Sequence, residues 1–291
     1  MNYKNLFVGI DIGGTKISIV FFKNKKIIKK IRIKTNNIFG PKNIDTIIKI
    51  LINYKDNIQE IGIATTGIIK DGIWSVLNKK TLGDFKDFPI VNYIKKRINK
   101  PVFAMGDTQA AALGELNYGS GKNLKNFFYI TVSTGVGGSI IINNKLINEK
   151  ESIVGQFGHM VIKKGGKICG CGRRGCIEAY ASGIALEKEL KKIKKNNITL
   201  KQMFINYKNS SWSKKIIDEG TTVIAEGIVN IYTVLGIKNF VIGGSIGLSN
   251  IFFLQLVKNI KKITKNKIFL TKAKLKNDSE VYGCLVRSLN K

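Results

Sequence analysis

The stretch GQFGHMVIKKGGKICGCGRRGCIE, residues 155–178, decides how this chain is interpreted. It contains the only histidine of the sequence and three of its four cysteines: His159, Cys169, Cys171 and Cys176. Thiolates and a neutral imidazole are ligands of tetrahedral Zn²⁺ sites, although C-x-C-x4-C is not a common finger spacing. The glycines between the cysteines allow the backbone to turn tightly around an ion. We therefore predict a zinc site; the alternative is three buried free thiols beside a core histidine.

The cysteine count also bears on the cellular compartment. Four cysteines in 291 residues are too few for a secreted disulfide scaffold, and no signal peptide precedes the first apolar run. No apolar run reaches the roughly 18 residues that a membrane span needs. We expect a cytoplasmic protein that does not associate with membranes.

The net charge of +30 at pH 7 invites a nucleic-acid-binding interpretation. Only five of the 49 basic residues are arginine, however, and the lysines are spread along the chain among Asn and Ile. Direct readout of bases favours arginine, and no helix-turn-helix, zinc-finger or RNP motif is present. The charge therefore indicates a compositional bias. We expect no specific nucleic-acid binding, only a weak, salt-sensitive affinity for polyanions.

A glycine-rich turn lies near the N-terminus. The apolar run Leu6–Ile10 predicts a buried strand, Asp11 and the turn Gly13-Gly14-Thr15-Lys16 follow it, and Ile17–Phe22 predicts the second strand of a hairpin. Backbone N–H groups and a threonine hydroxyl in such a turn can bind phosphate oxygens. No helix follows the glycines, which excludes the Rossmann fingerprint, and the P-loop spacing is absent. A plain hairpin without a ligand is the alternative.

The same pattern occurs a second time. Phe127–Val132 predicts a strand, Ser133–Gly138 (STGVGG) a turn, and the following residues as far as Ile142 another strand. A third glycine pair, Gly243-Gly244, follows an apolar run and suits either a nucleotide or a simple strand–turn–helix connection. Two strand–turn–strand units indicate a duplicated domain. Each half would offer one turn to a phosphate chain bound in the cleft between the halves.

Asp107 lies between the predicted strand Val102–Met105 and the alanine-rich predicted helix Thr108–Tyr118. Ligands of α/β sheets gather at the carboxyl ends of strands, and a helix dipole favours an ionised carboxylate. The alternative is an aspartate that only caps the helix. Further predicted helices span 43–54, 91–98, 181–195, 214–235, 251–263 and 282–289, and further strands span 26–34, 61–65 and 268–270.

Four motifs together carry a resemblance to a known family. Residues 11–16 (DIGGTK), 106–112 (GDTQAAA), 133–138 and 155–178 resemble, in this order along essentially the whole chain, the sugar kinases of the ROK family. The name stands for repressors, open reading frames and kinases. The resemblance implies the actin-like ATPase (ribonuclease H-like) fold, with two α/β domains around a cleft. It implies a small domain 1–106, closed by a helix 280–291, and a large domain 107–279 with the zinc site and a dimer surface.

The resemblance also assigns roles to residues of this sequence. Asp107 matches the general base that takes the proton from the sugar 6-hydroxyl, and Asp11 matches the carboxylate that holds Mg²⁺ through water. Contacts to phosphate or nucleotide are implied for Gly13, Gly14, Thr15, Lys16, Thr134, Gly135, Gly137, Gly138, Gly243 and Gly244. Sugar contacts are implied for Gly67, Gln156, His159 and Glu178 besides the base. A structural zinc ion would be held by His159, Cys169, Cys171 and Cys176, with no position left open for catalysis.

Two positions depart from the family pattern. The asparagine that normally precedes the base is Gly106 here, so one sugar contact is lost. The glutamate of the family's E-x-G-H motif is Gln156, whose amide can donate as well as accept and could meet the carbonyl of an N-acetyl group. Bacterial N-acetylmannosamine kinases of the family tend to lack this glutamate. The segments most similar to those kinases are 63–72, 77–78, 82–83 and 88–89.

The resemblance implies an ATP- and Mg²⁺-dependent kinase that phosphorylates the 6-hydroxyl of N-acetylmannosamine, a step of sialic acid catabolism, and that forms a homodimer. A kinase for glucose or N-acetylglucosamine is one alternative. A sugar-sensing ROK regulator is the alternative from a different class. It is disfavoured because the ten residues before Asp11 are too few for a helix-turn-helix domain.

Overall fold

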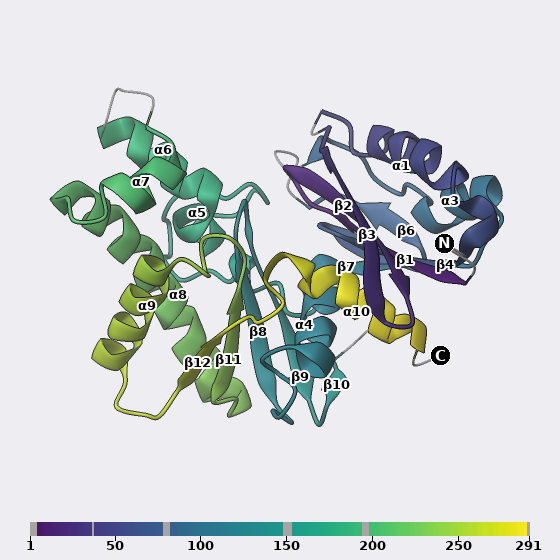
Figure 1. The fold of residues 1–291 in the computed structure, drawn as a ribbon. Helices are drawn as coiled ribbons and strands as arrows, with labels where there is room; N and C mark the ends of the chain where they lie inside the picture. Colours follow the sequence, from purple (N-terminus) through teal and green to yellow (C-terminus); the bar gives the residue numbers. More distant parts are fainter. Residues whose placement is uncertain (1–4, 37, 78–81, 148–152, 194–197, 290–291) are drawn as a thin grey trace. The chain divides into compact units, whose positions relative to one another are not determined.

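The computed structural model describes residues 5–36, 38–77, 82–147, 153–193 and 198–289 (Figure 1). The chain divides into two compact units, the first made of residues 1–123, 145–154 and 278–291 and the second of residues 124–144 and 155–277. The expected boundary after Gly106 differs from this division. Residues 107–123 belong to the first unit because helix α4 (Asp107–Tyr118) packs along helix α10 (Ser279–Leu289).

The first unit contains a five-stranded sheet in the order β3-β2-β1-β4-β7. Its strands are β1 (Leu6–Ile12), β2 (Lys16–Lys23), β3 (Lys26–Lys34), β4 (Ile58–Thr65) and β7 (Val102–Gly106). The first three form an antiparallel meander, whereas β4 runs parallel to β1 and β7 parallel to β4. The apolar runs therefore predicted every strand of this sheet, with differences only at the strand ends.

Four of the longer helices that the structure describes belong to the first unit. Helix α1 (Lys42–Ile52) buries Ile44, Ile47, Ile48 and Leu51. This i, i+3, i+4, i+7 spacing places all four side chains on one helix face. That face joins the core of β1, β2 and β4 together with helix α3 (Ile90–Ile98). Helix α10 packs against α4 and also contacts β1 and β4, so the end of the chain stabilises the sheet that begins it.

Several short elements were not predicted from the sequence, among them β5 (Ile68–Lys70), β6 (Ile73–Ser75) and α7 (Leu200–Asn206). Strands of three residues are too short to show a periodic pattern. The β5–β6 hairpin turns at Asp71 and Gly72, whose φ angles of 50° and 77° are those that two-residue hairpin loops favour. Asn78, part of the segment 77–78 singled out in the sequence, lies outside the described residues.

The second unit repeats the plan of the first. Its sheet has the order β10-β9-β8-β11-β12, which is the same relative order as in the first sheet. Four of its strands lie in the second unit: β8 (Phe127–Val132), β9 (Val136–Ile142), β11 (Asn239–Gly243) and β12 (Phe269–Lys272). The two-residue edge strand β10 (Lys145–Leu146) falls within residues 145–154, which are grouped with the first unit. Again the first hairpin is antiparallel, and the later strands run parallel to its first strand. The predicted duplication is confirmed, and the protein has the actin-like ATPase (ribonuclease H-like) fold.

Helices cover the second sheet. The long α8 (Ser211–Leu235) packs against α5 (Glu178–Ala181), α6 (Gly183–Ile193) and α9 (Asn250–Ile263). Its buried side chains join a core with Phe128 and Ile130 of β8. The predicted helix 181–195 is interrupted after Ala181, and residues 194–197 lie outside the described chain. Within the described ranges, no helix is both long and apolar enough to cross a membrane.

Candidate active site and metal centre

The carboxyl ends of three parallel strands meet at one edge of the first sheet. Strand register places Ile12 of β1 beside Thr65 of β4, and Thr65 beside Gly106 of β7. The chain leaves this edge through the turn 13–15, through Thr66 and Gly67, and through Asp107. Such an edge is where α/β sheets bind their ligands. The predicted phosphate turn, Gly67 and Asp107 are thus neighbours within the first unit.

The first glycine-rich turn is braced by a residue that the sequence did not single out. Thr35, directly after β3, donates its hydroxyl to the Gly13 carbonyl (2.7 Å) and its amide to the Thr15 carbonyl (3.2 Å). The amides of Gly14 and Thr15, by contrast, have no partner in the described parts of the chain. Adjacent free N–H groups in a turn form an anion-binding concavity.

Acidic groups accumulate at the same edge. Burial raises the pKa of Asp11 to about 7; the charge of Asp107 acts in the same direction, and Lys16 opposes it. Burial and then the charge of Asp11 raise the pKa of Glu280 well above its ordinary value. Glu280 is the second residue of α10, far along the chain from Asp11, so nothing in the local sequence indicated this proximity. Carboxylate oxygens gathered in this way are the ligands that Mg²⁺ prefers.

The raised pKa of Asp11 predicts the pH dependence of stability in the metal-free protein. A carboxyl with a higher pKa in the folded chain binds more protons when folded than when unfolded. Its contribution to the free energy of unfolding therefore decreases as pH rises from about 4, where the unfolded carboxyl ionises, to about 7. We expect the melting temperature to decrease over this range, and to decrease less in Asp11→Asn. Identical pH profiles of melting temperature for the two proteins would show that the pKa of Asp11 is not raised in the folded chain.

Asp107 is the first residue of α4, and Gly106, not Asp107, caps the helix. Its Oδ1 accepts the Thr108 amide at 2.7 Å, which lowers the pKa of Asp107, but burial has the larger effect and raises it. The helix terminus thus favours the ionised carboxylate, as expected, while burial opposes it with the larger effect on the pKa of Asp107. Gln109 closes the terminus by accepting the Gly106 amide at 3.2 Å.

The second glycine-rich turn is shorter than the segment 133–138 suggested. It comprises Ser133, Thr134 and Gly135, closed by the Ser133 amide donating to the Gly135 carbonyl at 2.9 Å. Gly137 and Gly138 already lie in β9, where they pair with β8. Only the first two of the four predicted contact residues in this segment are therefore turn residues.

The end of β11 adjoins this turn, since β8 and β11 are parallel neighbours. Gly243 ends the strand and Gly244 follows it, and the Ser245 hydroxyl lies 3.2 Å from that of Ser133. The amides of Ile246 and Gly247 both donate to the Val132 carbonyl, at 3.0 and 3.1 Å. The second turn and the third glycine pair therefore share the carboxyl edge of the second sheet.

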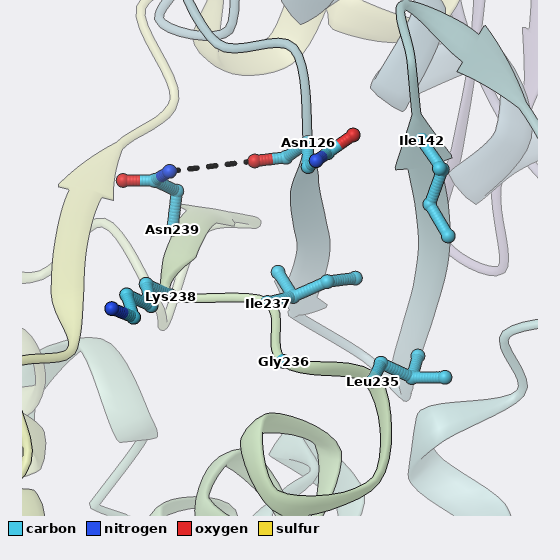
Figure 2. Close-up of a pocket in the computed structure, with 7 residues that line it drawn as sticks. All are labelled: Asn126, Ile142, Leu235, Gly236, Ile237, Lys238 and Asn239. Carbon is cyan, nitrogen blue, oxygen red and sulfur yellow. Dashed lines mark hydrogen bonds between the residues drawn. The ribbon is translucent and has the colours of Figure 1, made fainter.

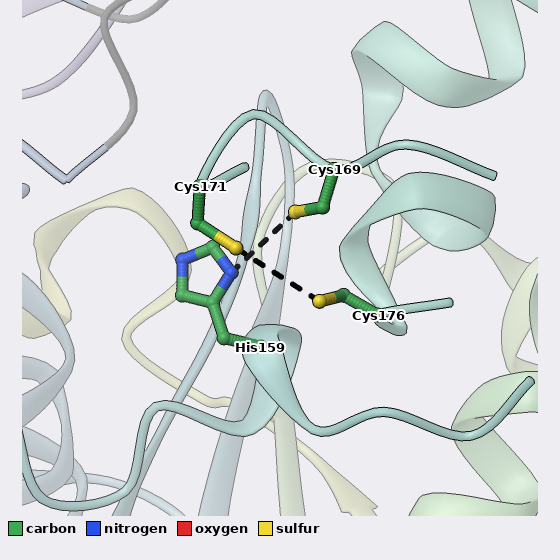
Figure 3. Close-up of side chains that lie close together, drawn as sticks. All are labelled: His159, Cys169, Cys171 and Cys176. Atoms are coloured by element: carbon green, nitrogen blue, oxygen red, sulfur yellow. Dashed lines mark hydrogen bonds between the residues drawn. The ribbon is translucent and has the colours of Figure 1, made fainter. Parts of the chain in front are cut away.

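The four soft ligands gather within the second unit (Figure 3). Their ligand atoms all lie within 4.8 Å of one another: His159, Cys169, Cys171 and Cys176. The Cys171 and Cys176 sulfurs are 3.9 Å apart, and the Cys169 sulfur is 3.6 Å from His159 Nδ1. A tetrahedron with Zn–S of about 2.3 Å and Zn–N of about 2.0–2.1 Å separates two sulfurs by roughly 3.8 Å, and sulfur from nitrogen by roughly 3.6 Å. Both of these distances match those between two ligands of one zinc ion.

The backbone holds these ligands in a tight loop. The Cys169 amide donates to the Arg173 carbonyl at 2.8 Å, and the Gly175 amide to the Lys167 carbonyl at 2.9 Å. Gly175 has φ of +81°, and a Cβ there would lie 1.8 Å from the Lys163 carbonyl oxygen, so only glycine fits. Burial raises the pKa of the Cys169 and Cys176 thiols, so a bound cation would have to supply the charge that favours thiolates.

Glu178 connects the metal centre with the second turn. Its Oε1 lies 3.9 Å from the Cys169 sulfur, and its Oε2 accepts the Val136 amide at 3.1 Å, where β9 begins. The side chain is buried, with 9% exposure. One carboxylate thus contacts both the cysteine loop and Val136, the residue directly after the glycine-rich turn. The sequence alone did not indicate this double contact.

Comparison with known proteins identifies the family. The profile of the ROK family matches residues 7–287. The chain belongs to the ROK family. It is 37% identical over 255 residues to the N-acetylmannosamine kinase of Haemophilus influenzae strain PittEE, covering 86% of this chain and 84% of that protein. It is 36% identical over 253 residues to the N-acetylmannosamine kinase of Pasteurella multocida strain Pm70, with the same coverage.

Solved structures of ROK proteins have the same fold. The crystal structure of a ROK family glucokinase from Streptomyces griseus, in complex with glucose and AMPPNP, matches with a TM-score of 0.85. The match covers 98% of this chain and 100% of that one at 24% identity. At this identity the likeness concerns the fold alone.

In this ROK protein, Gln156 and His159 belong to one turn. Gln156 directly precedes the 3-10 helix η2 (Phe157–His159), and the His159 amide donates to its carbonyl at 3.0 Å. Both side chains are half-buried. One backbone turn therefore holds Gln156, which departs from the family pattern, next to the predicted metal ligand His159.

A surface pocket of about 230 Å³ lies elsewhere in the second unit (Figure 2). It is lined by Asn126, Ile142, Leu235, Gly236, Ile237, Lys238 and Asn239. Asn126 precedes β8 and Asn239 begins β11, so the pocket is at the amino ends of these strands. The second glycine-rich turn and the pair Gly243-Gly244 follow the opposite ends of these strands, so these predicted ligand residues of the ROK protein lie away from the pocket.

Proposed function

We propose that this ROK protein transfers the γ-phosphoryl group of ATP to the 6-hydroxyl of N-acetylmannosamine. The observation that carries the proposal is the 34–37% identity, over most of both chains, to proteins from three bacterial species named N-acetylmannosamine kinase. Two sheets with a glycine-rich turn at the carboxyl edge of each are consistent with a phosphotransferase. Protein catalysis of phosphoryl transfer consists mainly of positioning and of charge stabilisation.

Asp107 is proposed as the general base. Because its Oδ1 accepts the Thr108 amide, its Oδ2 is the oxygen available for the proton of the sugar hydroxyl. Burial raises the pKa of this carboxyl towards neutrality, where a general base is most effective.

The carboxyl edge of the first sheet is proposed to bind Mg²⁺ with phosphate. The oxygen donors and the accumulated negative charge fit this ion, and Asp11 would hold it through water. Bound with ATP, Mg²⁺ supplies neutralisation of phosphate charge. Phosphate oxygens would be bound at the first turn by Gly13, Gly14, Thr15 and Lys16, and at the second by Thr134, Gly135, Gly137 and Gly138. Gly243 and Gly244 are assigned to the adenosine side.

The cysteine loop is proposed to hold a structural zinc ion and thereby to position the side chains that contact the sugar. His159 directs Nδ1 towards Cys169, which leaves its Nε2 for a sugar hydroxyl. A metal ligand held in this way has a fixed ring orientation. Glu178 and Gln156 are assigned to sugar contacts in the second unit, and Gly67 in the first. We further propose a cytoplasmic homodimer without specific nucleic-acid or membrane partners.

The proposal is tested by a coupled ADP-release assay with ATP and Mg²⁺ over a panel of hexoses and N-acetylhexosamines. The highest kcat/KM is expected for N-acetylmannosamine. A preference for glucose or N-acetylglucosamine would refute the proposed substrate but leave the proposed kinase activity intact. Absence of turnover with every sugar of the panel would overturn the kinase itself.

Gln156→Glu is expected to lower kcat/KM for N-acetylmannosamine and to raise relative activity on glucose. The glutamine amide can donate to the acetamide carbonyl, whereas a carboxylate only accepts. A mispaired polar contact costs about 1–3 kcal/mol, so we expect a change of about 5- to 150-fold in the specificity ratio. The measurement is kcat/KM of both proteins for the two sugars at fixed ATP. Unchanged ratios would show that Gln156 does not select the sugar.

A further inference from the structure

Trp74 is a fully buried residue of β6 that reaches the carboxyl edge of the first sheet. Its indole Nε1 donates to the Thr66 carbonyl at 2.9 Å. Thr66 directly follows β4 and precedes Gly67. The backbone of Trp74 is fixed by two hydrogen bonds with Phe88, of 2.8 and 3.0 Å. The indole is therefore a rigid donor that holds one particular carbonyl.

The aromatic surroundings fix the indole ring as well. Its centroid lies 4.6 Å from that of Phe85, with the rings inclined at 71°, and 6.5 Å from that of Phe88. Edge-to-face pairs of this kind stabilise a single ring orientation. The Thr65 hydroxyl also reaches the Thr66 carbonyl, but at 3.3 Å and from a side chain that is shared with the Ile12 carbonyl.

The hydrogen bond determines where the next amide points. The Thr66 carbonyl and the Gly67 N–H belong to one planar trans peptide, so they point in opposite directions. With the carbonyl held by Trp74, the N–H is turned away from the aromatic cluster. This N–H has no hydrogen-bond partner among the residues that the structure describes.

Only glycine fits at position 67. Its φ is +106°, and a Cβ at this position would lie 2.5 Å from the Ser75 carbonyl oxygen and 3.2 Å from the indole nitrogen. An unpartnered N–H at the carboxyl edge, beside the first turn and Asp107, is a donor for an oxygen atom of a ligand.

We infer that Trp74 is a positioning residue for the sugar: it orients the Thr66–Gly67 peptide so that the Gly67 N–H donates to an oxygen of the bound sugar. The inference rests on the proposed function. Trp74 itself does not touch the sugar; it acts through the peptide plane, and it therefore affects sugar binding more than nucleotide binding.

The test is Trp74→Phe, which keeps an aromatic ring in the cluster but removes the donor. We expect KM for the best sugar of the panel to rise about 5- to 20-fold, as loss of one hydrogen bond to a buried carbonyl would give. KM for ATP should stay within about twofold of the wild-type value, at this scale of effect. The matched control is Phe85→Leu, which disturbs the same cluster but keeps the indole donor, and which should leave the sugar KM near wild type.

Equal increases in sugar KM for both variants, or equal increases in the two KM values of Trp74→Phe, would overturn the inference, because either would indicate a general disturbance. If Trp74→Phe does not fold, Trp212→Phe provides the second test. It leaves Trp74 as the only tryptophan, since the chain contains two. Its fluorescence should change on titration with the sugar; an unchanged spectrum at saturating sugar would contradict the inference. Wild-type inactivity on all sugars would instead refute the proposed function.

Discussion

Asp107→Asn should reduce kcat by about 10²–10⁴-fold while the protein still folds and binds both substrates. The amide is nearly isosteric, and its Oδ1 can still accept the Thr108 amide that now lies at 2.7 Å. It cannot take up the proton of the sugar hydroxyl. Because burial raises the pKa of Asp107, the neutral amide also removes the cost of a buried charge at neutral pH. We therefore expect an unchanged or higher melting temperature together with the loss of turnover.

The measurements are kcat by the coupled assay and the dissociation constants of the sugar and of a non-hydrolysable ATP analogue by calorimetry. Asp56→Asn is the matched control, since Asp56 is an exposed aspartate of the 3-10 helix η1 (Lys55–Asn57) and should have wild-type kcat. If Asp107→Asn retained more than about a tenth of the wild-type rate, Asp107 would not be the base, given the usual size of such effects.

The parts of this protein that were predictable from sequence are those in which neighbours in the chain are also neighbours in space. The first turn joins two strands of one hairpin, and the metal ligands lie in one loop of 18 residues, 159–176. Local turn chemistry and ligand type therefore sufficed. The repeated strand–turn–strand pattern likewise predicted the repeated sheet order.

What the sequence did not reveal depends on distant pairings. Glu280 approaches Asp11 only because α10 packs on β1 and α4. The same packing makes α4 part of the first unit, whereas the sequence had placed it in the second domain. Thr35 braces the first turn because β3 pairs beside β2. Trp74 lies on a three-residue strand whose hydrogen bond to Thr66 spans a hairpin that leaves no periodic signal. Tertiary packing, not local propensity, sets these contacts.

Loss of the metal is expected to have the second large effect. Protein purified without chelator should contain about one zinc ion per chain, because the four ligand atoms lie within 4.8 Å of one another and two of their distances match a zinc tetrahedron. Cys176→Ser replaces a fully buried thiol at this centre. We expect the variant to lose zinc and to melt at a lower temperature, since structural zinc contributes on the order of 10 kcal/mol of apparent binding free energy in small domains.

The fourth cysteine supplies the control. Cys284 in α10 is as fully buried as Cys176 but belongs to the first unit. Cys284→Ser therefore introduces the same buried hydroxyl without touching the metal ligands, and should keep its zinc. Elemental analysis and melting curves of the three proteins separate the metal effect from that of burying a hydroxyl. Wild-type protein with almost no zinc but full activity and stability would refute the site.

Zinc loss should also weaken ATP binding, because Glu178 joins the two features. Its carboxylate lies 3.9 Å from the Cys169 sulfur and accepts the Val136 amide at 3.1 Å. When the cysteine loop loses its ion, Glu178 loses the fixed backbone that holds it, and the turn 133–135 loses its brace. In Cys176→Ser we therefore expect a higher KM for ATP as well as for the sugar, measured at a temperature where the variant is folded. An unchanged KM for ATP beside an increased sugar KM would mean that the loop positions the sugar alone.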